Sequence, residues 1–330
     1  MSAPAKGGPE VRRAVVVGAG LMGHGIAQVF ALGGIAVTMQ DRTDAILSAA
    51  VERIRRNLAA FVEAGLATPG EAEAAVARIR CTTDLAESVR QADFVTESIV
   101  EDLPTKRAIF AAIEAACPAE AILASNTSTF RITDIGAGCR RRDRLVITHY
   151  FNPPHLVPTV EVVRGEGTSE ATMEAAAAVL KRLGKAPVKI QKEVPGFVVN
   201  RIQAAMMREV LALIEAGVVS AADMDRACTG SFGFRLASIG PLETADLGGL
   251  DVWAKVLGEL LPLIDRSTTP PRVLLDKLQA GHLGVKSGRG FFDYAADYAT
   301  GELDTKVKRR DREFLERLKR LRGKGANYEL

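Results

Sequence analysis

The chain has 330 residues, of which 47% are hydrophobic and 25% are charged, a composition that excludes a disordered or collagen-like protein. Because a single hydrophobic core stops growing at roughly 250–300 residues, the length predicts two domains. The formal net charge is +3, but the segment 306–324 holds ten basic and three acidic residues. The remainder therefore carries a net charge of −4, and no nucleic-acid partner is expected.

Short apolar runs alternate with long helical patterns over the first 190 residues. The runs with the length and branching of buried parallel strands are Ala14–Gly18, Ile35–Gln40, Phe94–Ser98, Ile122–Ser125 and Leu145–His149. Helical patterns between them include Asp44–Ala64 and Lys106–Ala116. This alternation predicts an α/β domain at 1–192, built on a doubly wound, mostly parallel sheet. Its first ten residues are expected to be disordered.

The stretch from Ala14 to Gln40 carries no charge and superficially resembles a membrane span. It contains six glycines, which favour two buried strands joined by a glycine turn and a helix, so no membrane partner is expected. The four cysteines, Cys81, Cys117, Cys139 and Cys228, lack the spacing of a metal site. We interpret them as buried thiols and expect a cytoplasmic protein without a bound metal.

The character of the sequence changes after Lys192. A pattern of about twenty residues between Pro195 and Gly217 predicts a long buried helix. Only helical stretches and glycine turns follow, which predicts an all-helical domain at 193–294. A basic helical extension is expected at 295–330, with one apolar stripe containing Leu315 and Leu318. We expect this extension to pack on its own subunit or on a partner subunit.

A glycine-rich motif, Gly18-Ala-Gly20-Leu-Met-Gly23, follows the first predicted strand and begins a helix. Gly18 permits a tight turn, Gly20 lets the backbone approach a pyrophosphate, and Gly23 lets the helix pack on the strand. Leu21 and Met22 belong to the same turn, whose N–H groups would face the ligand. Asp41 ends the second strand and can accept hydrogen bonds from the adenosine ribose. A 2′-phosphate would meet its negative charge, so the motif favours NAD over NADP.

A histidine and a glutamate form the candidate acid–base pair. His149 ends an apolar strand, and the prolines that follow force the chain out of the sheet. Glu161 comes twelve residues later, after a run that could return beside the first strand. A carboxylate held against the imidazole would fix its tautomer and stabilise the imidazolium that forms on protonation. On position alone, His149 could equally be a structural histidine.

Seven motifs in order make the chain to Tyr294 similar to the 3-hydroxyacyl-CoA dehydrogenase family. They are GAGLMGHGIA at Gly18–Ala27, ESIVED at Glu97–Asp102, SNTS at Ser125–Ser128, HYFNP at His149–Pro153, PGFVVNR at Pro195–Arg201, GPLETADLGGLD at Gly240–Asp251 and KSGRGFFDY at Lys286–Tyr294. The resemblance implies a Rossmann NAD-binding domain followed by an all-α domain of the 6-phosphogluconate-dehydrogenase-like type. It also implies a homodimer formed through that second domain.

The resemblance also implies roles for individual residues. The family's catalytic pair falls on His149 and Glu161. Residues that hydrogen-bond the substrate's oxygens fall on Ser128 and Asn200, although Ser128 considered alone could simply cap a helix. The family's cofactor contacts fall on Asp41, Glu101, Lys106 and Asn126.

Two features of the sequence bear on whether the substrate is a CoA thioester or a free hydroxy acid. Pro153 and Pro154 make the chain similar to the branch of L-gulonate 3-dehydrogenase and lambda-crystallin, and no lysine occurs between Lys6 and Lys106 to meet CoA phosphates. Arg53 and Arg56 could meet those phosphates instead, or form a solvated helix face. The leading prediction is an NAD-dependent 3-hydroxyacyl-CoA dehydrogenase. The alternatives are a dehydrogenase of a free hydroxy acid, such as L-gulonate or a pyridine-ring acid, and a noncatalytic NAD-binding protein.

Overall fold

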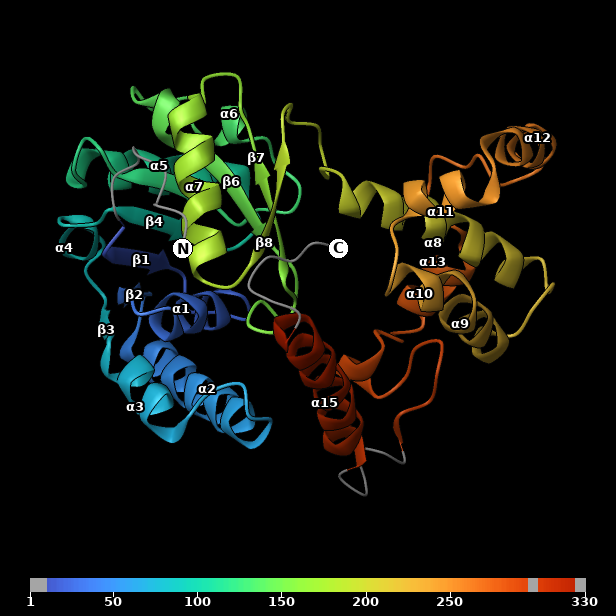
Figure 1. Cartoon of the computed structure of the whole chain (residues 1–330), viewed down its shortest axis with the longest axis horizontal. Coiled ribbons are helices and arrows are strands. Elements are labelled where there is room, and N and C mark those ends of the chain that lie inside the picture. Colours follow the sequence, from blue (N-terminus) through green and yellow to red (C-terminus); the bar gives the residue numbers. More distant parts are fainter. Residues whose placement is uncertain (1–10, 296–301, 324–330) are drawn as a thin grey trace. The chain divides into compact units, whose positions relative to one another are not determined.

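The computed structural model describes residues 11–295 and 302–323, and the predicted disorder of the first ten residues lies outside these ranges. Contacts divide the chain into two units (Figure 1). In the described ranges, the first unit comprises 11–198 and 311–323, and the second lies between Val199 and Arg310. The division falls six residues beyond the boundary expected from the sequence, and the end of the basic extension belongs to the first unit.

An eight-stranded sheet forms the centre of the first unit, in the order β3-β2-β1-β4-β5-β6-β7-β8. The strands are β1 Arg13–Val17, β2 Ala36–Gln40, β3 Ile79–Thr82, β4 Phe94–Glu97, β5 Ile122–Ser125, β6 Leu145–Tyr150, β7 Thr159–Val163 and β8 Ala186–Ile190. All neighbouring pairs are parallel except β6 and β7, which are antiparallel. The predicted doubly wound sheet is confirmed. Its order reverses beside β1, where open α/β sheets bind ligands at the carboxyl ends of their strands.

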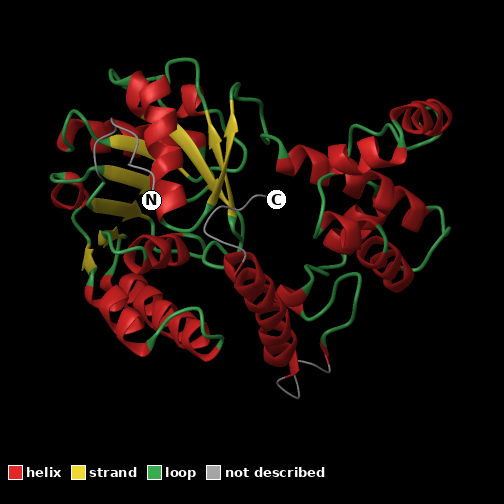
Figure 2. Cartoon of the chain, viewed as in Figure 1, coloured by secondary structure: helices red, strands yellow, loops and turns green. Residues whose placement is uncertain are grey.

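Helices cover both faces of this sheet (Figure 2). They are α1 Gly23–Leu32, α2 Asp44–Glu63, α3 Pro69–Ala77, α4 Leu85–Val89, α5 Leu103–Ala116, α6 Ile132–Ile135 and α7 Glu170–Arg182, with a 3₁₀ turn, η1, at Arg142–Arg144. Successive residues of β1 enter opposite cores: Val16 packs in the core that contains α1, α2 and α7, and Val15 in the core that contains α4, α5 and α6. Burial on both faces explains why the central strands are continuously apolar.

The edge strands carry weaker sequence signals. β3 is half-buried to exposed throughout, and β8 contains Pro187, because an edge strand has fewer neighbours and tolerates proline. The expectation of buried cysteines is wrong for three of the four. Cys81 lies on β3 and is exposed, and Cys117 and Cys228 are half-buried, so only Cys139 is buried.

The described part of the second unit is helical, as predicted, apart from isolated bridges at Arg289. Its helices are α8 Val199–Glu215, α9 Ala221–Gly230, α10 Phe232–Leu236, α11 Pro241–Gly248, α12 Leu250–Leu260 and α13 Arg272–Gln279, followed by a 3₁₀ turn, η2, at Val285–Ser287. The helix expected from Pro195 begins only at Val199. The cause is the left-handed backbone of Gly196 and Phe197, with φ of 76° and 49°, which cannot continue into a right-handed helix.

The basic extension forms α15, Glu302–Gly323. Leu315 and Leu318 of its apolar stripe are buried in a small cluster with Phe61 and Leu156. This end of the extension therefore packs on its own subunit. Across the described ranges, no helix combines the length and the apolar character that crossing a bilayer requires.

Candidate active site

The glycine-rich loop has the geometry that close ligand approach requires. A Cβ at Gly18, whose φ is 97°, would lie 2.5 Å from the carbonyl oxygen of Ser98. A Cβ at Gly23 would lie 1.7 Å from the carbonyl oxygen of Gly18. Gly20 has no atom within 4 Å of the same position, and Leu21 beside it is 69% exposed. Gly18 and Gly23 therefore close the turn, while Gly20 leaves the backbone open to a ligand, as a pyrophosphate site needs.

Asp41 is half-buried at the end of β2 and lies against this loop. Its Oδ2 accepts a hydrogen bond from the N–H of Ala19 at 2.7 Å, and its Oδ1 accepts one from the N–H of Arg42 at 2.7 Å. Arg53 Nη2 donates to the carbonyl oxygen of Ala19 at 3.1 Å. Asp41 thus holds the N–H group of Ala19, and Arg53 holds the carbonyl oxygen of the same residue. The open backbone of Gly20 and this fixed carboxylate fit a dinucleotide carrying a free ribose diol.

His24, in the first turn of α1, is buried. Its Nδ1 lies 2.8 Å from the carbonyl oxygen of Gly20. Burial lowers the pKa of His24 and outweighs the hydrogen bond to Gly20, and the charges of Arg53 and Arg56 lower it further. His24 is therefore neutral at pH 7 and adds no charge to the loop.

A buried ionic cluster lies where β4 ends. Lys106 is 1% exposed, and its Nζ lies 2.8 Å from Oε1 of Glu97 and 3.2 Å from Oε2 of Glu101. Glu97 is fully buried and also accepts hydrogen bonds from the Ser125 hydroxyl at 2.6 Å and the Ile99 N–H at 2.7 Å. The sequence prediction assigned no role to Glu97. An acidic residue that ends a buried strand was the available signal, because such a carboxylate needs a buried cation.

Glu101 connects this cluster to the loop after β5. Its Oε1 accepts hydrogen bonds from the Thr127 hydroxyl, the Ser128 N–H at 3.3 Å and the Thr129 N–H at 3.2 Å. Asn126, at the start of the same loop, accepts a hydrogen bond at Oδ1 from the N–H of Tyr150 at 2.9 Å. The loop is thereby fixed to the ends of β4 and β6. Glu101, Lys106, Asn126 and Ser128 therefore lie at one edge of the sheet, at the carboxyl ends of its parallel strands.

His149 and Glu161 lie directly opposite each other in the antiparallel pair of β6 and β7. Nδ1 of His149 is 2.7 Å from Oε2 of Glu161. Glu161 is fully buried, and the imidazole is 5% exposed beside the rings of Phe151 and Phe197 at centroid distances of 4.6 and 5.6 Å. A carboxylate can only accept, so Nδ1 carries a proton and Nε2 of the neutral imidazole is left as a base.

The turn before α8 also contacts Glu161. The Val198 N–H donates to Oε1 of Glu161 at 3.1 Å. Phe197 precedes it with a φ of 49°, in the left-handed region that a bulky side chain rarely adopts. This strained residue aims the next N–H at Glu161 and buries its ring beside His149. The sequence prediction missed this contact, since nothing in Pro195-Gly196-Phe197 indicates a positive φ at phenylalanine.

Two further predicted residues lie on helices. Asn200 is the second residue of α8 and belongs to the second unit. Arg56 is exposed on α2, three residues after Arg53, whose guanidinium group already contacts the glycine-rich loop. The roles of Asn200, Arg53 and Arg56 in substrate binding stay predictions.

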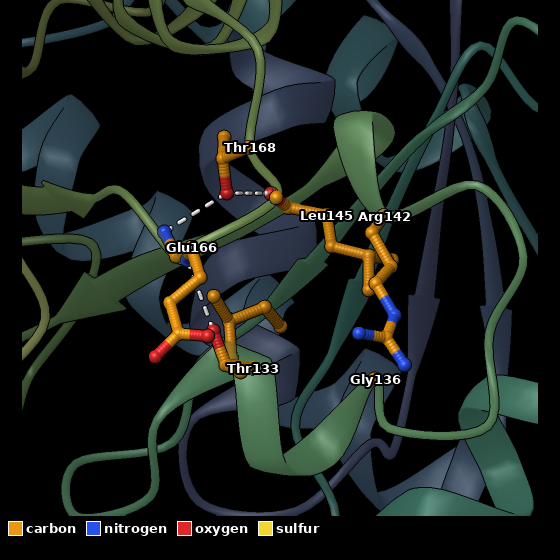
Figure 3. A pocket seen from close by; sticks show the side chains of 9 residues that line it. Thr133, Gly136, Arg142, Leu145, Glu166 and Thr168 are labelled. Atoms are coloured by element: carbon orange, nitrogen blue, oxygen red, sulfur yellow. Dashed lines mark hydrogen bonds between the residues drawn. The ribbon is translucent and has the colours of Figure 1, made fainter.

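A small cavity of about 160 Å³ lies at the opposite edge of the sheet (Figure 3). Leu145, the first residue of β6, and Arg142 line it. Its polar groups are bonded to one another: Thr168 donates to the Leu145 carbonyl oxygen at 2.6 Å, and the Glu166 N–H donates to Thr133 at 3.0 Å. Because ligands of such sheets bind at the carboxyl ends of the strands, this cavity is not the active site.

The fold and site define a dinucleotide-dependent dehydrogenase. The model of the 3-hydroxyacyl-CoA dehydrogenase NAD-binding domain matches residues 13–194, and that of the family's C-terminal domain matches residues 196–294. The chain therefore belongs to the 3-hydroxyacyl-CoA dehydrogenase family. It is an NAD-dependent oxidoreductase acting on a CH–OH group.

Individual relatives differ in their substrates. The chain is 35% identical to 5-formyl-3-hydroxy-2-methylpyridine 4-carboxylate 5-dehydrogenase of Mesorhizobium japonicum, over 87% of this chain and 92% of that protein. It is 36% identical to 3-hydroxybutyryl-CoA dehydrogenase of Mycobacterium tuberculosis, over 86% and 99%, and 38% identical to L-carnitine dehydrogenase of Streptomyces griseus, over 89% of each. A solved structure of a 5-formyl-3-hydroxy-2-methylpyridine 4-carboxylic acid 5-dehydrogenase matches with a TM-score of 0.84 and 31% identity, covering 93% of this chain and 99% of that one.

Replacing Asp41 with alanine is expected to weaken NAD binding about tenfold or more, since a hydrogen bond to a charged group contributes roughly 1.5–3 kcal/mol. Isothermal titration with NAD measures the change. Asp44→Ala is the matched control, because Asp44 is exposed at the start of α2 and loses the same charge. An unchanged dissociation constant for Asp41→Ala would refute the ribose role.

Proposed function

We propose that this enzyme interconverts a 3-hydroxyacyl thioester of CoA and the 3-ketoacyl thioester, with NAD as the hydride acceptor. The observation that carries the proposal is the His149–Glu161 pair, placed at the carboxyl edge of the sheet that bears the glycine-rich loop. Membership of the family and the 36% identity to a 3-hydroxybutyryl-CoA dehydrogenase support the choice of substrate.

When bound, NAD supplies an acceptor for the hydride that leaves C3 of the substrate. Nε2 of His149 removes the proton of the C3 hydroxyl, and Glu161 stabilises the imidazolium ion through Nδ1. In the reverse direction, the imidazolium returns this proton to the developing alkoxide. The Ser128 hydroxyl and the Asn200 amide hydrogen-bond the substrate's oxygens. Burial of the pair strengthens its attraction, because fewer water molecules screen the two charges.

The cofactor-binding residues act as two groups in this proposal. Gly18, Gly20, Leu21, Met22 and Gly23 present the backbone to the pyrophosphate, and Asp41 receives the ribose hydroxyls. Glu101, Lys106 and Asn126 form the rim on the nicotinamide side. Because Lys106 is only 1% exposed, it acts by holding Glu101 in place, and Glu101 and Asn126 meet the cofactor.

A free hydroxy acid is the second candidate substrate. The identity to L-carnitine and pyridine-carboxylate dehydrogenases favours this substrate class. The contacts of the two arginines favour it as well, because Arg53 already donates to the carbonyl oxygen of Ala19 at 3.1 Å. Arg56 is the more exposed of the two arginines proposed to meet a CoA phosphate.

The two candidates are separated by measuring NADH oxidation with acetoacetyl-CoA in parallel with NAD reduction by L-gulonate, L-carnitine and 3-hydroxybutyrate. We expect kcat/KM to be highest for the thioester. Efficient turnover of one free acid, with none of the thioester, would overturn the leading proposal and establish the second. Turnover of no compound would favour the noncatalytic alternative.

We also infer a cytoplasmic homodimer with a role in fatty acid metabolism. Support for the dimer comes from large apolar side chains that the second unit leaves exposed, among them Phe234 at 74% and Leu242 at 81%. Exposed large apolar side chains are typical of subunit interfaces when they gather in one patch. Sedimentation velocity should give twice the 35.2 kDa mass of the chain; a monomer at micromolar concentration would contradict the inference.

A further inference from the structure

A cavity of about 250 Å³ lies within the first unit, and none of the residues that line it is among those assigned above to cofactor or substrate. Its walls come from α1, the connection between α2 and α3, the end of α7 and the end of α15. Phe61, Leu66 and Leu318 form part of an apolar wall. The basic extension therefore helps to enclose a cavity of nearly ligand size.

Three cations line this cavity: Arg182, Lys185 and Arg322. Each donates hydrogen bonds to main-chain carbonyl oxygens, and within the described ranges none forms an ion pair with a carboxylate. The one acidic residue in the wall, Glu71, is occupied in the capping box of α3, where it accepts from the Thr68 N–H at 2.7 Å. Arg182 and Arg322 are exposed to solvent, whereas Lys185 is buried. Among the described residues that line the cavity, cationic side chains outnumber carboxylates three to one.

Lys185 shows this imbalance most clearly. Its side chain is 5% exposed, and Nζ donates to the carbonyl oxygens of Pro154 at 2.6 Å and Val157 at 2.8 Å. Burial, with a smaller contribution from the charge of Arg322, lowers the pKa of Lys185 to about 7. A buried ammonium group without a counter-ion is costly, so an anion beside it would be stabilising.

An unpartnered donor also lines the cavity. Gln28 is 1% exposed, and its Oε1 accepts a hydrogen bond from Nδ2 of Asn57 at 3.0 Å. That bond fixes the orientation of the amide, and Nε2 is buried without a partner. Buried donors are almost always satisfied in folded proteins. The missing acceptor at Gln28 and the missing counter-ion at the buried Lys185 point to the same kind of ligand.

We propose that this cavity binds a small organic anion: its carboxylate or phosphate group meets Arg182, Lys185, Arg322 and the Gln28 amide, and its short apolar body lies against Phe61 and Leu318. The site is separate from the dehydrogenase chemistry, and its test does not depend on turnover. Arg322 supports the apolar contact as well, since its guanidinium carbon lies 6.0 Å from the centroid of the Phe61 ring. The basic extension thereby acquires a ligand-binding role in addition to its packing.

Isothermal titration of the full chain, saturated with NAD, tests the site with hexanoate and n-butyl phosphate as anionic probes and hexan-1-ol as a neutral one. We expect at least one anion to bind with a submillimolar dissociation constant and hexan-1-ol to bind at least tenfold more weakly. The preferred anion decides between a carboxylate and a phosphate source.

The decisive variant is Arg322→Glu, which is expected to weaken anion binding at least tenfold, while Arg322→Lys retains most of it. Arg320→Glu is the matched control, since Arg320 is exposed on the same helix, outside the cavity, and undergoes the same charge reversal. Equal thermal midpoints for the two Glu variants show that α15 remains packed. Three results would overturn the proposal: no binding of either anion, equal binding of hexan-1-ol, or equal losses for Arg320→Glu and Arg322→Glu.

Discussion

Replacing His149 with alanine is expected to lower kcat by a factor of about 10²–10⁴ and to leave the affinity for NAD nearly unchanged. The imidazole is the proposed base for the substrate hydroxyl, and Glu161 lies 2.7 Å from its Nδ1. Neither residue belongs to the glycine-rich loop or to the Asp41 contact, so cofactor binding should survive. Steady-state kinetics and NAD titration on the same preparation measure both quantities.

Glu161→Gln provides a second variant for the same mechanism. An amide can still orient the imidazole, but it cannot neutralise the imidazolium, so a loss smaller than that of His149→Ala is expected. Full activity of His149→Ala would refute the mechanism, whereas a parallel loss of NAD binding would indicate a structural role for the histidine.

Replacing Lys106 with methionine is expected to lower the free energy of unfolding by about 3–5 kcal/mol, the usual result of leaving a buried charge unpaired. Glu97 would keep two neutral hydrogen-bond donors, Ser125 and the Ile99 N–H, but would lose its only ion pair within the described part of the chain. Glu101 would lose the cation that holds it beside the loop after β5. Weaker NAD binding should therefore accompany the loss of stability.

Lys189→Met is the matched control for this variant. Lys189 forms an ion pair with Glu174 at 2.7 Å, a distance close to the 2.8 Å of the Lys106–Glu97 pair, but its side chain is 39% exposed and that of Glu174 is 56% exposed. Solvent screening limits such a pair to roughly 0–1 kcal/mol. Urea unfolding followed by circular dichroism compares the two variants. Equal losses would show that burial of the Lys106 cluster adds nothing, and the double variant Lys106→Met with Glu97→Gln should recover part of the stability.

The central strands were predictable because both of their faces are buried, and Val15 and Val16 of β1 enter different cores. The edge strand β3 was not predictable. Its side chains are only half-buried to exposed, so its sequence lacks the alternation of apolar and polar residues that marks a strand. The start of α8 was also missed, because the left-handed φ of Phe197 depends on burial of its ring. Local sequence carries no signal for such tertiary constraints.

The proximity of His149 and Glu161 was predictable because twelve residues containing three prolines can return a strand beside its predecessor, and the antiparallel register confirms their pairing. The position of Arg53 was not predictable. Its carbonyl partner, Ala19, is 34 residues away in the sequence, and only the packing of α2 on α1 brings them together. The ion pairs of Lys106 with Glu97 and Glu101 were likewise hidden, since a lysine in an amphipathic helix is ordinarily solvated.

The most direct test of the account is transfer of deuterium from NADH carrying deuterium at both C4 positions to acetoacetyl-CoA, with the product analysed by mass spectrometry. We predict a 3-hydroxybutyryl thioester one mass unit heavier than the unlabelled product, with the label at C3, and formation of this product slowed by a factor of about 10²–10⁴ with His149→Ala. A product without the label, or oxidation of the labelled NADH with no reduction of the thioester, would contradict it.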